Sequence, residues 1–164
     1  MTYKTYIGID NGVSGAWGVI APLFNLFIPT PIFLTQDYTK TKKNINRIDV
    51  EKLITFLESF DVRNSIAILE RPMVNPGRFQ STASALRCLE ATLIILERFK
   101  IPYRFIDSKE WQKVLLPKEL KKEELKKASM DIGIRLFPNF KDQILKQKDA
   151  DALLIAEYSR RSNF

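Results

Sequence analysis

A chain of 164 residues with 45% hydrophobic and 11% aromatic residues can bury the core of one domain, so we expect a single domain over residues 1–164. Lysine and arginine total 26 against 19 aspartates and glutamates, and this net charge of +7 favours a polyanionic partner such as nucleic acid. The sequence has no histidine, which excludes imidazole-based catalysis and histidine-ligated metals and leaves carboxylates, lysines, tyrosines or water for the chemistry.

The N-terminal third predicts three antiparallel strands. Residues 3–9 are rich in β-branched and aromatic side chains, and the Asp-Asn-Gly sequence at 10–12 is a tight-turn signal between two antiparallel strands. Residues 17–20 continue the second strand. Residues 23–34 predict a third strand, which two prolines place at a sheet edge or end early.

The middle of the chain changes to alternating helices and strands. Residues 35–46 are polar and lysine-rich and predict a basic loop, after which Asp49 is a suitable N-cap for an amphipathic helix through Phe60. The apolar run 65–69, which leads to Glu70, predicts a buried and parallel strand.

A long helix is predicted from Ser81, as its N-cap, to Phe99, following a loop. It carries two apolar stripes, so one can pack on the sheet and the other on a neighbouring molecule. Burial of both stripes within one chain is the alternative.

The C-terminal part predicts one more strand and three helices. The strand covers 103–106, Ser108 caps a short helix, a basic amphipathic helix over 121–137 ends at a proline, and a final helix starts near Asp149. The fold class is therefore α/β, with a mixed five-stranded sheet of three antiparallel strands and then parallel strands, flanked by helices.

The sequence gives no sign of a membrane or secreted protein. The longest mainly apolar run, 17–34, is short and interrupted by prolines, and residues 1–6 lack the features of a signal peptide. Cys88 is the only cysteine, cannot form an intramolecular disulfide, and is expected in the core. We expect a cytoplasmic protein.

Four acids stand where an apolar element begins or ends. Asp10 ends the first strand, Glu70 ends the fourth, and Asp149 and Asp151 open the last helix. If the first and fourth strands are parallel neighbours, their acids meet at one sheet edge, and the last helix can bring its acids there. Clustered carboxylates repel one another unless cations lie among them, so the pattern predicts two hard divalent cations acting on a phosphodiester.

Each acid also has a structural explanation when taken singly. Asp10 could form the turn that follows it, Glu70 could pair with Arg71, and Asp149 could be an N-cap. Asp151 is harder to explain in this way, because it directly precedes an apolar helix face that should be buried.

Three segments together resemble the RuvC-type Holliday junction resolvases of the RNase H-like superfamily, especially their short bacteriophage versions. The segments are Tyr6-Ile7-Gly8-Ile9-Asp10-Asn11-Gly12, Ala67-Ile68-Leu69-Glu70-Arg71-Pro72 and Asp149-Ala150-Asp151-Ala152-Leu153-Leu154-Ile155-Ala156. The intervening segments follow in the expected order, so the resemblance covers nearly the whole chain. It implies an RNase H-like fold, a homodimer with two active sites, Mg²⁺ or Mn²⁺, and paired nicks across a four-way junction.

The resemblance assigns metal-binding and catalytic roles to Asp10, Glu70 and Asp151, with two ions in each active site. The family pattern has another aspartate three residues before the last, where this chain has Lys148. Asp149 is the nearest substitute, and we expect it to be the fourth metal-binding and catalytic acid.

The family also has a basic residue near the scissile phosphate, and Lys127 is the candidate here. The basic segment 98–127 suits contacts to the DNA backbone without base specificity. We expect DNA contacts from Arg71, Arg78, Phe79, Lys113, Lys122 and Lys126. Phe79 could stack on an unpaired base or act as a hydrophobic staple for the next helix, and the lysines could form an ordinary solvated face.

These features predict a homodimeric, Mg²⁺-dependent endonuclease that cuts four-way junctions and related branched DNA, with Mn²⁺ as a substitute and the helix 81–99 in the dimer interface. One alternative is a protein that binds junctions with weak or no cleavage, and another is an RNase H-type ribonuclease. A sugar-kinase or actin-like ATPase shares the Gly-Ile-Asp-Asn-Gly motif, but such proteins need two related domains around the nucleotide.

Overall fold

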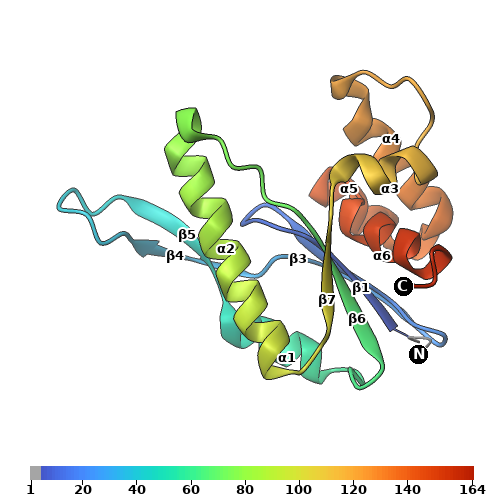
Figure 1. Cartoon of the computed structure of the whole chain (residues 1–164), viewed down its shortest axis with the longest axis horizontal. Coiled ribbons are helices and arrows are strands. Elements are labelled where there is room, and N and C mark those ends of the chain that lie inside the picture. The colour runs from blue at the N-terminus through green and yellow to red at the C-terminus, as the bar shows by residue number, and fades with distance from the viewer. Residues whose placement is uncertain (1–4) are drawn as a thin grey trace.

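The computed structural model describes residues 5–164, so the predicted start of the first strand, Tyr3 and Lys4, lies outside the described residues. Five strands form a central sheet in the order β3-β2-β1-β6-β7 (Figure 1). They are β1 (Thr5–Asp10), β2 (Ala16–Ile20), β3 (Asn25–Pro29), β6 (Ser65–Glu70) and β7 (Tyr103–Ile106). The first three are antiparallel, and β6 and β7 extend the sheet in parallel with β1. The predicted mixed sheet is confirmed.

Helices cover both faces of this sheet, with α1 and α2 on one face and α3 to α6 on the other (Figure 1). They are α1 (Val50–Glu58), α2 (Phe79–Arg98), α3 (Ser108–Leu115), α4 (Lys122–Leu136), α5 (Lys141–Gln147) and α6 (Asp151–Arg161). Successive side chains of β1 point to opposite faces of the sheet. Ile7 and Ile9 lie in the core under α1 and α2, and Tyr6 lies in the core under α6. Cys88 is buried in the former, as predicted. None of the helices between residues 5 and 164 has the length and apolarity needed to cross a membrane.

Two glycines let α6 pack directly on the sheet. A Cβ atom on Gly8 of β1 would overlap the Ala152 carbonyl oxygen, and one on Gly18 of β2 would lie 2.7 Å from the Leu153 backbone nitrogen. Only glycine permits such a close approach of the two backbones. Because residues 152–156 are fully buried, the start of α6 is held firmly near the carboxyl end of β1.

The hairpin predicted at the start of the chain is confirmed, with a longer turn. Asp10 pairs with Ala16, so the connecting loop covers residues 11–15 rather than a tight two-residue turn. Within it the Gly15 N–H donates to the Gly12 carbonyl oxygen at 3.1 Å. Asp10 is therefore a paired residue at the end of β1, and not the first residue of a tight turn.

Residues 30–46 differ from the prediction of a continued third strand followed by a basic loop. They contain β4 (Ile32–Gln36), which pairs with β5 (Asn44–Ile48) in a separate antiparallel two-stranded sheet. The prolines at 29 and 31 end β3 and redirect the chain. Asp37 then closes the new hairpin by accepting hydrogen bonds from the backbone N–H groups of Thr39 and Lys43, both at 3.1 Å.

Two helix starts were placed wrongly from the sequence. α2 begins at Phe79 rather than after Ser81, because a 3-10 turn over Pro76–Arg78 leads straight into it. The N-cap of α3 is Asp107 rather than Ser108, since Asp107 forms a capping box with the first turn. The N-cap predicted for α1 is confirmed, because the Asp49 side chain accepts from the first turn of that helix.

An additional helix, α5, precedes the acidic pair and was not predicted. It ends at Lys148, a C-cap residue in the left-handed conformation with φ 68°. Ala150 is the N-cap of α6, so the explanation of Asp149 as an N-cap is wrong. The chain thus turns sharply between two helices, and Asp149 and Asp151 lie at this turn.

Candidate metal centre

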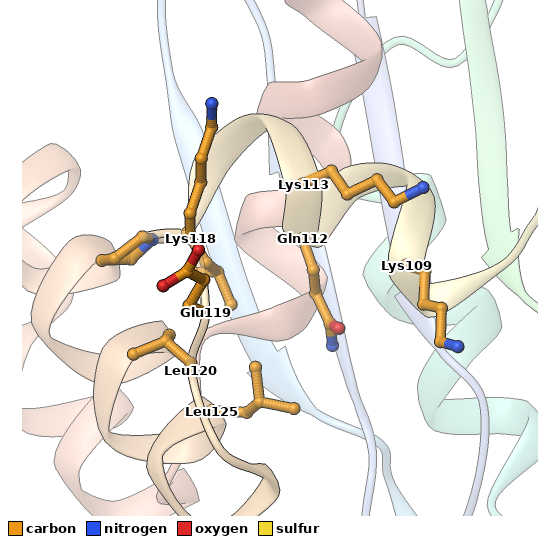
Figure 2. Close-up of a pocket in the computed structure, with 9 residues that line it drawn as sticks. Lys109, Gln112, Lys113, Lys118, Glu119, Leu120 and Leu125 are labelled. Atoms are coloured by element: carbon orange, nitrogen blue, oxygen red, sulfur yellow. The ribbon is translucent and has the colours of Figure 1, made fainter.

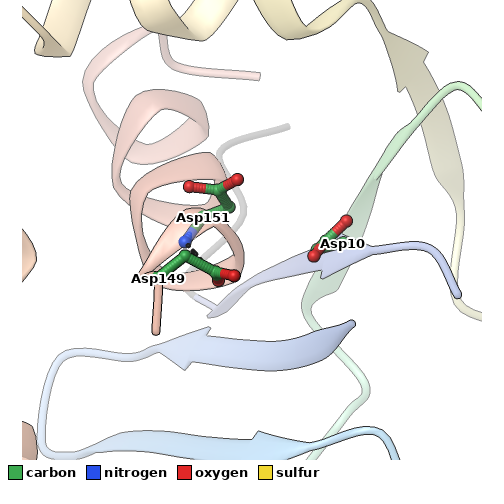
Figure 3. Close-up of side chains that lie close together, drawn as sticks. All are labelled: Asp10, Asp149 and Asp151. Atoms are coloured by element: carbon green, nitrogen blue, oxygen red, sulfur yellow. Dashed lines mark hydrogen bonds between the residues drawn. The ribbon is translucent and has the colours of Figure 1, made fainter. Parts of the chain in front are cut away.

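Three of the four predicted acids converge at one edge of the sheet. Asp10 comes from the end of β1, and Asp149 and Asp151 come from the turn into α6 (Figure 3). Each offers one carboxylate oxygen to a group in which these atoms all lie within 4.8 Å of one another. Asp149 is buried, and Asp10 and Asp151 are half-buried. The close packing of α6 on β1 creates this arrangement.

Glu70 lies at the same edge but in a different hydrogen-bonding environment. Since β1 and β6 are parallel, with Ile9 opposite Leu69, Glu70 ends its strand beside Asp10. Its Oε1 accepts from the Ser108 hydroxyl at 2.6 Å, and its Oε2 accepts from the Trp111 indole N–H at 3.1 Å. The carboxylate of Glu70 is therefore fixed by α3.

Arg71 does not pair with Glu70. Its guanidinium donates to Asp107 at 2.9 Å, so the explanation of Glu70 as one half of an ion pair with its neighbour is wrong. The negative charge of Glu70 is left to act on the aspartates, and it raises the pKa of Asp10, Asp149 and Asp151.

The pKa values of all three aspartates are raised, as expected where carboxylates cluster with little positive charge beside them. Burial, and then the charges of Asp151, Glu70 and Asp149, raise the pKa of Asp10 well above its ordinary value. Burial, followed by the charge of Asp149, raises the pKa of Asp151 to about 7. Burial also raises the pKa of Asp149. Such shifts are typical of functional sites, where carboxylates are kept close together at a cost in stability.

Lys126 is the basic residue whose charge reaches the cluster, since it lowers the pKa of all three aspartates. It extends from α4 and its side chain is exposed. Lys127, the residue predicted to lie near the scissile phosphate, is exposed at the next position.

Three supporting residues were not foreseen. Ser129 of α4 is buried, donates its hydroxyl to Asp151 and accepts from the Ala150 N–H at 3.0 Å. Ser108 and the fully buried Trp111 orient Glu70. In the sequence, these three residues stand out only as hydrogen-bond donors on apolar helix faces. That pattern indicates a supporting role only when the carboxylate that each residue faces is known.

The predicted DNA-binding residues fall in four places. Arg71 and Arg78 line a hollow of about 340 Å³ that also contains Asp10 and Glu70. Phe79 is 70% exposed at the start of α2, which argues against a packed hydrophobic staple.

Lys113 lies on a separate cavity of about 440 Å³ between α3 and α4. Figure 2 shows Lys109, Lys113 and Lys118 with their amino groups directed away from the apolar Leu120 and Leu125. Lys122 is exposed at the first turn of α4. The lysines are thus available to a polyanion on the same side of the sheet as Lys126.

The donor set fits a hard divalent cation. All available ligand atoms in the cluster are carboxylate oxygens, which Mg²⁺ and Mn²⁺ prefer over nitrogen or sulfur ligands. A cation would also relieve the repulsion that raises the pKa values of the aspartates. The residues present are therefore suited to holding a metal.

Sequence comparison adds nothing here, because no family model and no curated protein matches the chain. Comparison of structures is informative. A structure described as T. thermophilus RuvC in complex with Holliday junction substrate has a TM-score of 0.58, with 98% of this chain and 97% of that chain covered at 16% identity. The chain has a RuvC-type fold. A second Thermus thermophilus RuvC structure has a TM-score of 0.50 at 16% identity and covers 96% of each chain.

The RuvC-type fold confirms the RNase H-like architecture that the resemblance implied, over nearly the whole chain. At 16% identity, the likeness establishes the fold and leaves the activity to be argued from the site.

Proposed function

We propose that this chain is a divalent-metal-dependent endonuclease that cuts branched DNA, with four-way junctions as its main substrate. The observation that carries the proposal is the meeting of Asp10, Asp149 and Asp151 within 4.8 Å at the edge of a RuvC-type sheet. The similar RuvC structure is in complex with a Holliday junction, and the net charge of +7 suits a nucleic-acid partner.

Asp10, Asp149 and Asp151 would hold one ion, and Glu70 would complete the site for a second. Hydrogen bonds from Ser108 and Trp111 leave room for a cation on Glu70, since a carboxylate has about four lone-pair sites. Bound Mg²⁺ or Mn²⁺ would supply positive charge that polarises the phosphodiester and eases the ionisation of attacking water.

Side chains around the acids have complementary tasks in this proposal. Ser129 fixes the orientation of Asp151, and Ser108 and Trp111 fix that of Glu70. Lys126 of α4, whose charge lowers the pKa of all three aspartates, would contact the scissile phosphate. Lys127, the next residue of the helix, would contact the DNA backbone.

DNA contacts would follow from the exposed cations and aromatic ring around the acids. Arg71 and Arg78 share a hollow with Asp10 and Glu70, where they can contact phosphates on either side of the cut. The exposed Phe79 can stack on an unpaired base at the branch point, a contact worth about 1–3 kcal/mol. Lys113 and Lys122 would hold a neighbouring duplex arm.

Paired nicks require two active sites, and we propose a homodimer formed through α2. Most of both apolar stripes is buried within the chain, since Cys88, Ile95 and Leu96 lie in the core and Leu89 and Leu93 pack against it. Leu86 and Ile94 remain exposed, at 43% and 57%. In a twofold dimer these two side chains would pack against the same helix of a second copy. A monomer at micromolar concentration in sizing experiments would contradict this part of the proposal.

The test of the activity offers synthetic four-way, three-way, flap and linear DNAs with Mg²⁺, Mn²⁺ or EDTA, and maps the nicks. We expect metal-dependent, symmetrically placed nicks in the four-way junction and little cutting of linear DNA. Binding without cutting in either metal would favour the junction-binding alternative. Preferred cutting of RNA–DNA hybrids would favour an RNase H-type ribonuclease.

Asp10→Asn removes a ligand charge while keeping the side-chain shape, so we expect cleavage to fall by about 10³-fold or more with junction affinity retained. Asp142→Asn, at an exposed acid in α5, is the matched control and should cleave normally. Normal cleavage by Asp10→Asn would remove Asp10 from the mechanism.

A further inference from the structure

A trough leads away from the carboxylates on the side of α2. The hollow of about 340 Å³ beside Asp10 and Glu70 adjoins a second hollow of about 520 Å³, because both have Asn11, Ser81 and Ala85 in their walls. The Asn11 side-chain amide donates to the Ala85 carbonyl oxygen at 3.1 Å. This bond ties the loop after β1 to α2 and keeps the passage between the hollows in a fixed shape.

The second hollow ends at the β4–β5 hairpin. Its walls are the loop after β1, two turns of α2 between Gln80 and Arg87, and residues 45–46 of β5. Small and polar side chains dominate them, and Arg87 is the only charged residue in these walls. A phosphate backbone can enter such a trough without meeting a carboxylate until it reaches the acidic cluster.

The tip of the hairpin is strongly basic. Lys40, Lys42 and Lys43 are all exposed, and Asp37 is the one acid between β4 and β5. The Asp37 carboxylate is engaged within the turn by the hydroxyl and backbone N–H of Thr39 and by the backbone N–H of Lys43. These bonds order the backbone of the turn from which the three exposed lysine side chains extend.

The hairpin contributes little to the core and extends away from the rest of the molecule (Figure 1). Its strands form a sheet of their own, and most of their side chains are exposed or half-buried. Isolated two-stranded hairpins are marginally stable. Within residues 5–164, no ion pair involves Lys40, Lys42 or Lys43. The charges of the hairpin are thus free for a ligand.

We propose that the β4–β5 hairpin is a DNA-binding arm whose lysines contact the backbone phosphates of a duplex that leaves the acidic cluster along the trough. The proposal rests on the proposed function and adds a second contact region to it. Five-residue strands with a rise of roughly 3.3 Å per residue extend about 17 Å, which is about half a turn of duplex DNA. The contact is therefore expected in the duplex arm, away from the branch point, and without base specificity.

The test compares two matched double variants in the cleavage-deficient Asp10→Asn background. Lys42→Asn with Lys43→Gln removes two charges from the arm. Lys141→Gln with Lys146→Gln removes two exposed charges from α5, on the opposite face of the sheet from α2 (Figure 1). Lys42 has a left-handed backbone with φ 46°, so asparagine, which tolerates that conformation, replaces it.

We expect the arm variant to bind a four-way junction about 3- to 10-fold more weakly at 100 mM salt. The slope of log K against log salt should fall by about 1 to 2, since each lost phosphate contact removes about 0.9. The α5 variant should stay within about twofold of the parent. Thermal unfolding of both variants should match the parent, because the altered side chains are exposed.

Three outcomes would contradict the proposal that the hairpin is a DNA-binding arm. Equal weakening by both double variants would mean that net charge alone matters, and unchanged binding by the arm variant would mean that the hairpin does not contact DNA. Weaker binding together with loss of the dimer in sizing experiments would assign the hairpin to a second copy of the chain. If the unaltered chain binds no branched DNA, the proposed function itself fails, and the two failures are thereby distinguished.

Discussion

The acidic edge where β1 meets α6 and the basic β4–β5 hairpin place their charges in opposite ways. The edge holds Asp10, Asp149 and Asp151 together in a buried setting, where their pKa values are raised. The hairpin holds its lysines in solvent, where positive charges cost little. Rigid packing holds the mutually repelling carboxylates together at the edge. The hairpin needs only a closed turn to carry its exposed lysines.

This difference separates two tasks that the proposed nuclease would have to perform. Chemistry requires ligands fixed to within a fraction of an ångström, which a buried edge provides. Backbone binding requires charges within reach of phosphates and tolerates looser placement. The comparison predicts large effects from small changes at the edge and graded, salt-dependent effects at the hairpin.

The strongest way to break the rigid edge is Gly8→Ala. The added methyl group would overlap the Ala152 carbonyl oxygen and lie 2.5 Å from the Ala156 backbone nitrogen, so α6 must move away from β1. We expect the free energy of unfolding to fall by about 2–3 kcal/mol, measured by urea denaturation. Gly77→Ala, where the nearest atom to a Cβ would be 3.3 Å away on a side chain, should cost less than about 1 kcal/mol. An equal loss in both variants would contradict the close packing of α6.

The role of Lys126 is tested against its neighbour. Lys126→Gln should reduce single-turnover cleavage by about 10- to 30-fold, since it removes the positive charge that acts on the aspartates. Lys127→Gln should reduce it by no more than about threefold. A larger loss with Lys127→Gln would restore the residue expected from the sequence.

The sequence predicted the acids better than it predicted their surroundings. Asp10 and Glu70 could be placed because parallel strands end at the same sheet edge. Asp149 reaches the cluster because Lys148 adopts a left-handed conformation and ends α5, which residue patterns do not reveal. Lys126 could not be distinguished from Lys127, since both lie on the exposed side of an amphipathic helix.

The strands of the hairpin were missed for a different reason. The apolar run at the start of β4 continues the apolar character of β3, and only the prolines between them mark the break. Neither strand shows the clean alternation of a half-buried strand, because most of the hairpin is exposed. Ser129 and Trp111 likewise have roles that depend on tertiary contacts with Asp151 and Glu70.

A smaller effect is expected from pH on the metal-free chain. The folded-state pKa of Asp151, about 7, exceeds its ordinary value of 3.8, so the folded chain binds this proton more tightly than the unfolded chain. The free energy of unfolding should therefore fall as pH rises from about 4 to about 7, and level off above that. We expect a loss of at least about 1 kcal/mol, or about 2–4 °C in the unfolding midpoint. Asp151→Asn should flatten this dependence, and an equally steep profile in that variant would contradict the assignment.

The claim that the acidic edge holds divalent cations is tested most directly by calorimetric titration of Mn²⁺ into the metal-free chain near pH 7. We predict binding to the unaltered chain with proton release, since the raised pKa values leave protons on the aspartates that a cation must displace. Asp151→Asn should weaken this binding by about tenfold or more, while Asp142→Asn should leave it unchanged. Absence of binding to the unaltered chain, or equal binding by the Asp151→Asn variant, would contradict the metal centre.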